Sequence, residues 1–325
     1  MCAKTIGVEI GNATIKLAVC SGGKVSTMAV ERLPEGLVRD GRVTAPAAMS
    51  QFIKQMRKRY GVPGGNCALV LPGQNIIGRM VSLPVMGDEE LQLNLPFEFR
   101  DFIGKDSGKY SYDYSVIDVK NNVMELYAAA APTDLVEDYY GILKKAGLKM
   151  KAAMPAEMAW LNLIRITKDE PKKLCIVDIG AKYTRVNIFA NDHYVMGKDI
   201  EIAGSTIDQA IVSAENVDPY VARTHKESNI KNVLAEDFST EIYAAIAIEV
   251  MKIINFYCSS TPDGIMLKDI YFAGGSSAIE ALRTAILKRT DFNVHHVRRL
   301  VKCDSLDDDT VMFCAIAAGA GMQLQ

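Results

Sequence analysis

Two short segments of this chain, almost half its length apart, share one design. Residues 5–20 read TIGVEIGNATIKLAVC and residues 174–189 read LCIVDIGAKYTRVNIF. In each, an apolar strand carries an acid near its end, a glycine follows two positions later, and a second strand begins. Glu9 and Gly11 in the first segment correspond to Asp178 and Gly180 in the second. A repeat at this spacing predicts a duplicated chain with two lobes of related fold.

The acid and glycine turn has a specific chemical use. Leu174 to Ile179 is apolar except at Asp178, and a carboxylate at the end of a buried strand is costly unless it has a partner. Gly180 lets the backbone approach a ligand, and the amides that follow can point at an anion. The pattern therefore fits a phosphate with its Mg²⁺. An ordinary hairpin with a solvated aspartate fits the three letters DIG equally well.

A glycine pair late in the chain is the third feature. Asp269 to Ala273 predicts a short strand, Gly274-Gly275-Ser276-Ser277 predicts a turn, and IEALRTAIL has helical spacing. A strand-to-helix turn with a serine N-cap would give the same letters.

Composition excludes several classes of protein. The 325 residues carry a formal net charge of -2, so there is no basic excess to neutralise nucleic acid phosphates. The seven cysteines form no CxxC pair, which is typical of reduced, cytoplasmic proteins. The longest uncharged stretch, residues 310–325, is shorter than the ~20 residues of a membrane span. We therefore expect no nucleic acid binding and no direct membrane insertion.

In this order, the three motifs resemble those of the actin-like ATPase superfamily. The resemblance implies an α/β, two-lobed actin-like ATPase (ribonuclease H-like) fold, in which two phosphate hairpins face each other across a cleft and share one nucleotide. It implies ATP and Mg²⁺ as ligands, with Glu9 and Asp178 holding the metal. The residues implied to contact the nucleotide are Gly11, Asn12, Ala13, Lys16, Gly180, Ala181 and Lys182 at the phosphates, and Gly274, Gly275, Ser276 and Ser277 near adenosine.

The same resemblance implies roles for two further residues. Glu157 lies on a helix predicted over 155–167, where some relatives carry the residue that orients the attacking water. Lys226 lies on a helix predicted over 219–227, where relatives place a lysine near the base or ribose. Each is also compatible with an ordinary solvated side chain.

Residues 72–103 narrow the resemblance to one family, the PilM-like type IV pilus assembly proteins of the FtsA/PilM branch. The matching positions, in family order, are Arg79, Leu83-Pro84, Glu90-Leu91, Phe97-Glu98 and Ile103. Pro96 departs from the pattern and is expected to kink or split its helix. A hairpin follows about Asn121-Asn122, so a small α+β insertion of the 1C type is expected.

The expected boundaries follow from this comparison. The first lobe core, of 1A type, is expected to consist of residues 1–64, 131–172 and 309–325, with the insertion at 65–130. The second lobe core, of 2A type, is expected to consist of residues 173–204 and 262–308, with a helical 2B-type subdomain at 205–261.

The family resemblance implies a nucleotide-binding scaffold for type IV pilus or type II secretion assembly. Its implied partner is the N-terminal cytoplasmic tail of an inner-membrane PilN-like protein, alongside other pilus assembly proteins. The tail would dock between the insertion and the first lobe, on a surface that includes Leu83, Val85, Met86 and Phe97. The chain would then be cytoplasmic and peripheral at the inner face of the membrane. Because Glu9 stands where the family usually has aspartate, ATP hydrolysis is expected to be slow or absent.

Two alternatives belong to the same superfamily. An FtsA-like division protein would need an amphipathic membrane-targeting helix, and the sequence given ends three residues after Met322. A small-molecule (sugar) kinase would need a dedicated aspartate base and, in one branch, a cysteine-rich zinc motif. Neither is evident in the sequence.

Overall fold

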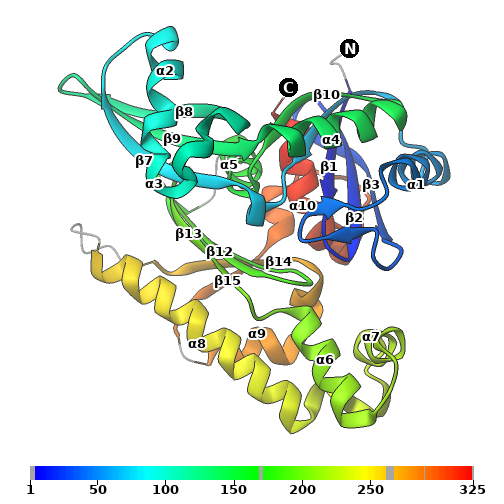
Figure 1. The fold of residues 1–325 in the computed structure, drawn as a ribbon. Helices are drawn as coiled ribbons and strands as arrows, with labels where there is room; N and C mark the ends of the chain where they lie inside the picture. Colours follow the sequence, from blue (N-terminus) through cyan, green and yellow to red (C-terminus); the bar gives the residue numbers. More distant parts are fainter. Residues whose placement is uncertain (1–3, 168–170, 261–266, 289, 324–325) are drawn as a thin grey trace. The chain divides into compact units, whose positions relative to one another are not determined.

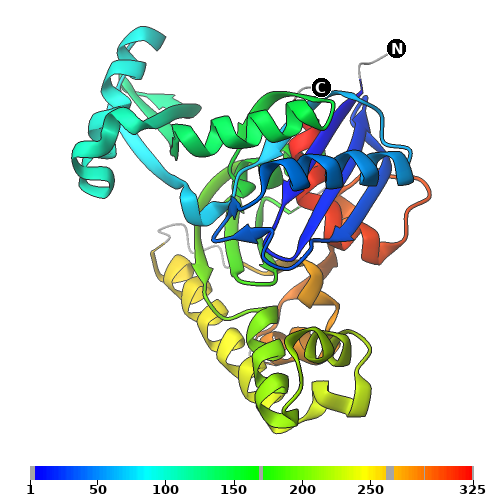
Figure 2. The same ribbon diagram turned by 45° about the vertical axis from the view of Figure 1, so that its right-hand side comes forward.

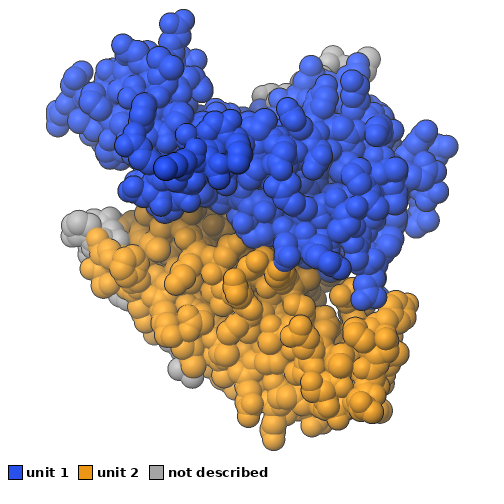
Figure 3. All heavy atoms as spheres, viewed as in Figure 1, with its two compact units in different colours: residues 1–166, 302–306, 316–325 blue, residues 167–301, 307–315 orange. Residues whose placement is uncertain are grey.

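The computed structural model of the chain describes residues 4–167, 171–260, 267–288 and 290–323. These residues fall into two compact units, coloured separately in Figure 3. Unit 1 comprises residues 1–166, 302–306 and 316–325, and unit 2 comprises residues 167–301 and 307–315. The last helix, α10 (Asp308–Met322), contributes residues to both units.

Unit 1 is built on a five-stranded sheet in the order β10-β6-β1-β2-β3. The strands β1, β2 and β3 form an antiparallel meander, and β6 and β10 extend it in parallel on the other side of β1. Their bounds are β1 (Thr5–Ile10), β2 (Thr14–Ser21), β3 (Lys24–Arg32), β6 (Gly65–Val70) and β10 (Leu148–Met154). A two-stranded ribbon, β4 (Val38–Arg39) and β5 (Arg42–Val43), lies after the meander.

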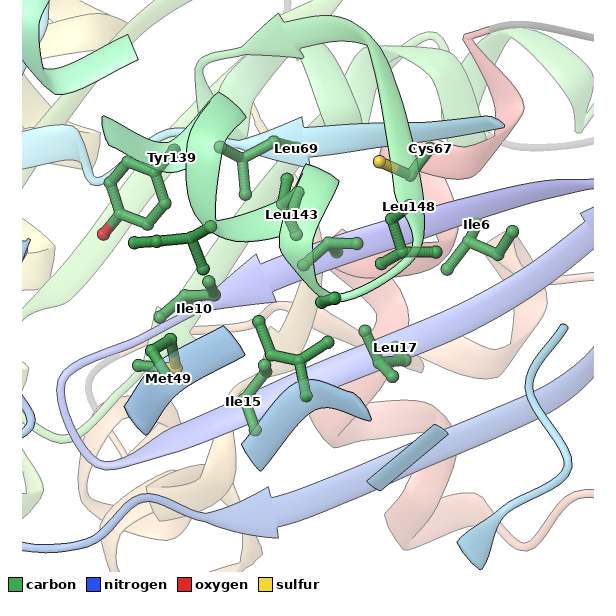
Figure 4. Close-up of a cluster of buried hydrophobic side chains, with 14 of the residues drawn as sticks. Ile6, Ile10, Ile15, Leu17, Met49, Cys67, Leu69, Tyr139, Leu143 and Leu148 are labelled. Carbon is green, nitrogen blue, oxygen red and sulfur yellow. The ribbon is translucent and has the colours of Figure 1, made fainter. Parts of the chain in front are cut away.

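The main core of unit 1 lies between this sheet and two helices. The helices α1 (Pro46–Arg59) and α4 (Thr133–Lys145) place Met49, Ile53 and Tyr139 against Ile6 and Ile10 of β1, together with Ile15 and Leu17 of β2 (Figure 4). Alternate residues of β1 point the other way, toward α10. There a Cβ on Gly7 would lie 1.6 Å from the carbonyl oxygen of Ala317, so only glycine permits this approach.

Unit 2 repeats the architecture of unit 1. Its sheet has the order β13-β12-β11-β14-β15, with an antiparallel meander on one side and two parallel strands on the other. The bounds are β11 (Lys173–Ile179), β12 (Thr184–Ala190), β13 (His193–Ile200), β14 (Asp269–Ala273) and β15 (Asn293–His296). Glu9 pairs with Lys16 across the first hairpin, and Asp178 pairs with Arg185 across the second, so the predicted duplication is confirmed to the residue.

Helices cover the face of this second sheet that carries Cys175 and Val177. They are α6 (Gly204–Glu215), α7 (Pro219–Glu227), α8 (Asp237–Ser260) and α9 (Glu280–Leu287) (Figure 1). Among the described residues α8 is the one helix long and apolar enough to cross a bilayer by length and composition alone. Tyr243, Ile246 and Val250 on α8 pack into the core of unit 2, which is the arrangement of a core helix.

The insertion in unit 1 has a three-stranded antiparallel sheet in the order β7-β9-β8. Its elements are β7 (Ile77–Pro84), α2 (Asp88–Glu98), α3 (Arg100–Ile103), β8 (Tyr110–Lys120) and β9 (Val123–Pro132) (Figures 1 and 2). The hairpin turns at Asn121 and Asn122 as predicted, with both residues at positive φ. The insertion has small cores of its own, centred on Leu95, Phe99 and Leu126.

The helix that Pro96 was expected to kink or split is divided at Phe99, shortly after the proline. Helix α2 runs through Pro96 and ends at Glu98, and the break before α3 falls at Phe99. Proline has no amide to donate to the carbonyl oxygen of Gln92 one turn earlier, and the helix ends two residues after it. At α4, Pro132 occupies the N-cap position and Thr133 is the first helical residue. The remaining helix of unit 1 is α5 (Ala156–Ile166).

Candidate functional site

The carboxylate of Asp178 is buried at the end of β11, next to the glycine turn after β14. Gly274 has φ +83°, and a Cβ at this position would lie 2.3 Å from Asp178 Oδ1 and 2.6 Å from the carbonyl oxygen of Ile179. Both the backbone conformation and the space therefore require glycine. The first residue of the predicted glycine pair thus lets the turn pass directly beside the acid.

Three segments far apart in sequence meet at Gly180. The carbonyl oxygen of Gly180 accepts hydrogen bonds from the amide of Gly204 (3.1 Å) and from Ser276 Oγ (3.2 Å). The amide of Ser205 donates to the carbonyl oxygen of Ala181 at 2.7 Å. The acidic hairpin, the start of α6 and the glycine-rich turn are thereby fixed to one another within unit 2.

Lys226 reaches the same place from α7. Its Nζ donates to the carbonyl oxygen of Gly204 at 2.8 Å and forms an ion pair with Asp208 Oδ1 at 2.7 Å. The two side chains are only 12% and 11% exposed. The structure therefore brings Lys226 to Gly180, Gly204 and Ser276, where the sequence left open a plain surface lysine.

Sequence reasoning missed Asp208. The available signal was its position between Ile207 and Ile211 on the buried side of α6, where an acid needs a partner. Nearby, hydrogen bonds from His225 and Lys231 lower the pKa of the Glu215 carboxyl, which ties α6 to the helix that carries Lys226.

In unit 1 the corresponding hairpin holds its acid in an ion pair. Lys16 Nζ lies 2.8 Å from Glu9 Oε1, and both side chains are mostly buried. The amide of Gly11 donates to the carbonyl oxygen of Thr14 at 2.9 Å and closes the turn. A Cβ on Gly11 would lie 3.5 Å from Lys16 Nζ, so the turn and the ion pair are neighbours.

The tips of both turns offer backbone donors. Within the part of the chain that the structure describes, the amides of Asn12, Ala13 and Ala181 donate no hydrogen bond to protein. Successive amides at a tight turn form a concave anion site, so both hairpins have the donors that a phosphate needs. This is the feature that fits a nucleotide phosphate.

Other predicted site residues have different surroundings. Ser277 is buried and its hydroxyl donates to the carbonyl oxygen of Ala273, while Gly275 lies against the ring of Phe313. The ammonium group of Lys182 lies 5.6 Å from the centre of the Tyr183 ring. The structure thus brings Ser276 to Gly180 but turns Ser277 toward the end of β14.

Glu157 is held at the base of the insertion. The hydroxyl of Tyr127, on β9, donates to Glu157 Oε1, and a Cβ on Gly78 of β7 would lie 2.1 Å from that hydroxyl. The contact joins α5 to the insertion. Tyr127 was missed by sequence reasoning, since a tyrosine in a strand carries no distinguishing signal.

The acidic side chains at these turns suit Mg²⁺ that is also bound by phosphates and water. They do not suit a metal ion bound by protein ligands alone. No group of three or more histidine, cysteine, aspartate or glutamate side chains gathers to hold a metal ion among the described residues. Mg²⁺ is usually held by one or two carboxylates together with substrate phosphates and water. Asp178 and Glu9, each beside a turn with open amides, are donors of that kind.

Comparison with known proteins gives both a family and a set of structural neighbours. A family model described as type IV pilus assembly protein PilM matches residues 7–308. The solved structure named PilM-PilN type IV pilus biogenesis complex is 20% identical, covers 100% of this chain and 99% of that chain, and has a TM-score of 0.86. No curated protein sequence matches the chain.

More distant structures share the fold. The ethanolamine utilization protein EutJ from Carboxydothermus hydrogenoformans is 15% identical over 97% of this chain and 89% of that chain, with a TM-score of 0.62. A ROK family glucokinase from Streptomyces griseus, solved with glucose and AMPPNP, is 12% identical over 98% of both chains, with a TM-score of 0.53.

The duplicated sheets and these neighbours define the class of protein: the chain has the two-lobed actin-like ATPase fold, with a small α+β insertion in its first lobe. Because the family model covers most of the sequence, the family is also shown. The chain belongs to the type IV pilus assembly protein PilM family.

Proposed function

We propose that this PilM-family chain is a nucleotide-binding scaffold of type IV pilus assembly, or of the related type II secretion machinery, and that it binds ATP with Mg²⁺. The observation that carries the proposal is the convergence of Gly180, Gly204, Ser276 and Lys226 beside Asp178 within unit 2. The nucleotide in the related glucokinase structure adds support at the level of the fold.

In this proposal the two hairpins have matching roles. The amides of Asn12, Ala13 and Ala181 bind phosphate oxygens, with Gly11, Gly180 and Lys182 completing the two turns, and Asp178 and Glu9 hold Mg²⁺ directly or through its waters. Lys16 balances phosphate charge, and Lys226 contacts the base or ribose. Gly274, Gly275 and Ser276 form the adenosine side, with Ser277 supporting the turn from behind.

Calorimetric titration with Mg-ATP tests the nucleotide site. We expect binding to the unmodified chain and at least tenfold weaker binding in Asp178→Ala, because the metal and its phosphates lose a carboxylate. Asp134→Ala removes an exposed acid of unit 1 and should leave ATP affinity unchanged. The proposal fails if the folded chain does not bind Mg-ATP, or if Asp178→Ala binds it normally.

For the partner, we propose that the N-terminal cytoplasmic tail of an inner-membrane PilN-like protein docks on the insertion, which would hold the chain at the inner face of the membrane. Support comes from the family and from β7, which is an edge strand with one side unpaired in the sheet. An extended tail can add main-chain hydrogen bonds to such an edge. Met80 pairs with Tyr127 across β7 and β9, so both lie on the face that contacts α5.

The apolar residues expected at this surface differ in how much of each side chain is exposed. Leu83 and Met86 are partly buried against the small cores of the insertion, so they contribute little free surface. Val85 is exposed beside the hairpin turn, and its amide donates to Asn122. Phe97 lies on the far side of α2 from the sheet, which removes it from the proposed tail site.

Fluorescence anisotropy with labelled N-terminal peptides of the membrane proteins encoded beside this gene tests the docking site. We expect one peptide to bind, and Met80→Asp to weaken it at least tenfold by placing a charge on the proposed face. Phe97→Asp is the matched control and should bind normally. Failure of every peptide would refute the partner, and normal binding by Met80→Asp would refute the location.

A further inference from the structure

Helix α2 has apolar residues on two opposite faces. Leu91, Leu95 and Phe99 follow one another at intervals of four and are buried against the insertion sheet. Leu93 and Phe97 are two positions out of phase, which turns them by about 200° from that face. They are 73% and 61% exposed, and almost half of the large exposed apolar residues among the described residues lie in the insertion. Leu93 and Phe97 are one helical turn apart and therefore form one continuous exposed apolar surface, which indicates a binding surface.

The same outer face of α2 is acidic. Glu89 and Glu90 lie four and three residues before Leu93, so they occupy the next turn of the same face. Residues 88–98 contain four acids and no lysine or arginine. Arg100, whose guanidinium lies 5.1 Å from the centre of the Phe97 ring, is the neighbouring base.

The negative charge of the outer face of α2 discriminates among its possible binding partners. Two copies of the chain meeting through this face would bring like charges together, which is unfavourable. An anionic membrane surface would be repelled for the same reason. A protein segment with apolar anchors and flanking lysines or arginines would bury Leu93 and Phe97 and satisfy the acids. A ridge of side chains at four-residue spacing fits another helix.

We propose that the outer face of α2, defined by Glu89, Glu90, Leu93 and Phe97, is a second docking surface, for a basic amphipathic helix of a partner protein. It is distinct from the proposed tail site, because Leu93 and Phe97 point away from the sheet whose edge strand would receive the tail. One chain then connects two partners through opposite sides of its insertion.

The test uses a fluorescent amphipathic helix built only of leucine and lysine, and a counterpart with glutamate in place of lysine. We expect the folded full chain to bind the lysine peptide with an affinity that falls as salt rises, and to bind the glutamate peptide at least tenfold more weakly. The double variant Leu93→Ala/Phe97→Ala should weaken binding at least tenfold. Glu89→Gln/Glu90→Gln should remove most of the salt dependence while retaining an acceptor at the start of the helix.

Matched control variants distinguish binding at the outer face of α2 from binding at other exposed apolar surfaces. Ile248→Ala/Phe256→Ala removes another exposed apolar pair, on α8, and should bind the lysine peptide normally. Met80→Asp should also bind it normally, whatever its effect on the tail peptide. Equal binding of the lysine peptide by Leu93→Ala/Phe97→Ala and the unmodified chain would overturn the proposal. Self-association of the chain, or binding to phosphatidylglycerol vesicles, that is lost in this variant would assign the face to a second copy or to a membrane instead.

Discussion

At the scale of single residues, the candidate site is defined by charges that already have protein partners. Glu9 is paired with Lys16 and Asp208 with Lys226, and each pair is mostly buried beside a glycine turn. A buried pair holds its members in place, but it gives little stability because both charges lose their hydration. Such pairs are therefore better explained by the positioning of a lysine than by stability.

Removing one member of a buried pair should be much more costly than breaking a surface pair. Asp208→Ala leaves the Lys226 ammonium buried with the carbonyl oxygen of Gly204, and we expect it to lower the free energy of unfolding by about 3–5 kcal/mol. Asp134→Ala breaks an exposed pair with Arg42 and should cost about 1 kcal/mol or less. Urea denaturation of both variants measures the difference, and equal costs would show that the Asp208 pair is effectively solvated.

At the scale of elements, close backbone contacts explain the glycines of the last helix. In unit 1, a Cβ on Gly319 would lie 2.1 Å from the carbonyl oxygen of Ala159, so α10 and α5 touch through their backbones. Gly321 likewise approaches Cys20 and the amide of Gly7. The small residues at the end of the sequence thus serve close packing within unit 1.

Two alanine substitutions in helices should therefore have opposite effects. Gly319→Ala forces α10 away from α5 and should destabilise unit 1 by about 1–3 kcal/mol. Gly141→Ala, inside α4, meets nothing within 4 Å and should stabilise the chain by about 0.5–1 kcal/mol, because glycine is a poor helix former. Thermal unfolding of the two variants checks both signs, and a stabilised Gly319→Ala would contradict the close contact.

The elements also show where sequence reasoning succeeds and where it stops. The hairpins and their register followed from Glu9, Gly11, Asp178 and Gly180, because a buried acid beside a glycine is a rare local pattern. The strands β10 and β15 were missed. β10 reads LKMKAAM, with lysines on alternate positions, and its pairing with β6 depends on contacts that no local pattern encodes.

In the candidate site, the sequence predicts only the residues that belong to a short, recognisable motif. Acids, glycines and lysines could be named from their motifs, but their partners could not. Asp208 and Tyr127 come from helices and strands whose neighbours are fixed by tertiary packing. Phe97 was likewise grouped with apolar residues of the preceding strand and loop, because only the burial of Leu91 and Leu95 shows that Phe97 faces outward.

At the scale of the whole molecule, the same design occurs twice with different acids and different partners. In unit 2, Asp178 lies against a glycine that makes room for it, whereas in unit 1 the longer Glu9 is drawn to Lys16. The other acid of interest in unit 1, Glu157, accepts a hydrogen bond from Tyr127 at the base of the insertion. Glu157, the acid implied to orient the attacking water, is therefore engaged in holding the insertion, and the metal-site acid Glu9 is held in an ion pair.

We accordingly expect ATP to act on this chain as a structural ligand with slow or absent hydrolysis. Mg-ATP at a hundredfold excess over its Kd should add about 2.7 kcal/mol to the stability of the bound form and raise the Tm, because only the folded chain binds it. Steady-state phosphate release should stay below the ~1 per second that marks the slow end of typical enzymes. Tyr127→Phe frees Glu157 from its hydrogen bond, so faster phosphate release in that variant would show that this contact restrains a competent acid. Brisk hydrolysis by the unmodified chain, with Glu9 still paired to Lys16, would contradict the scaffold function and point to an ATPase cycle instead.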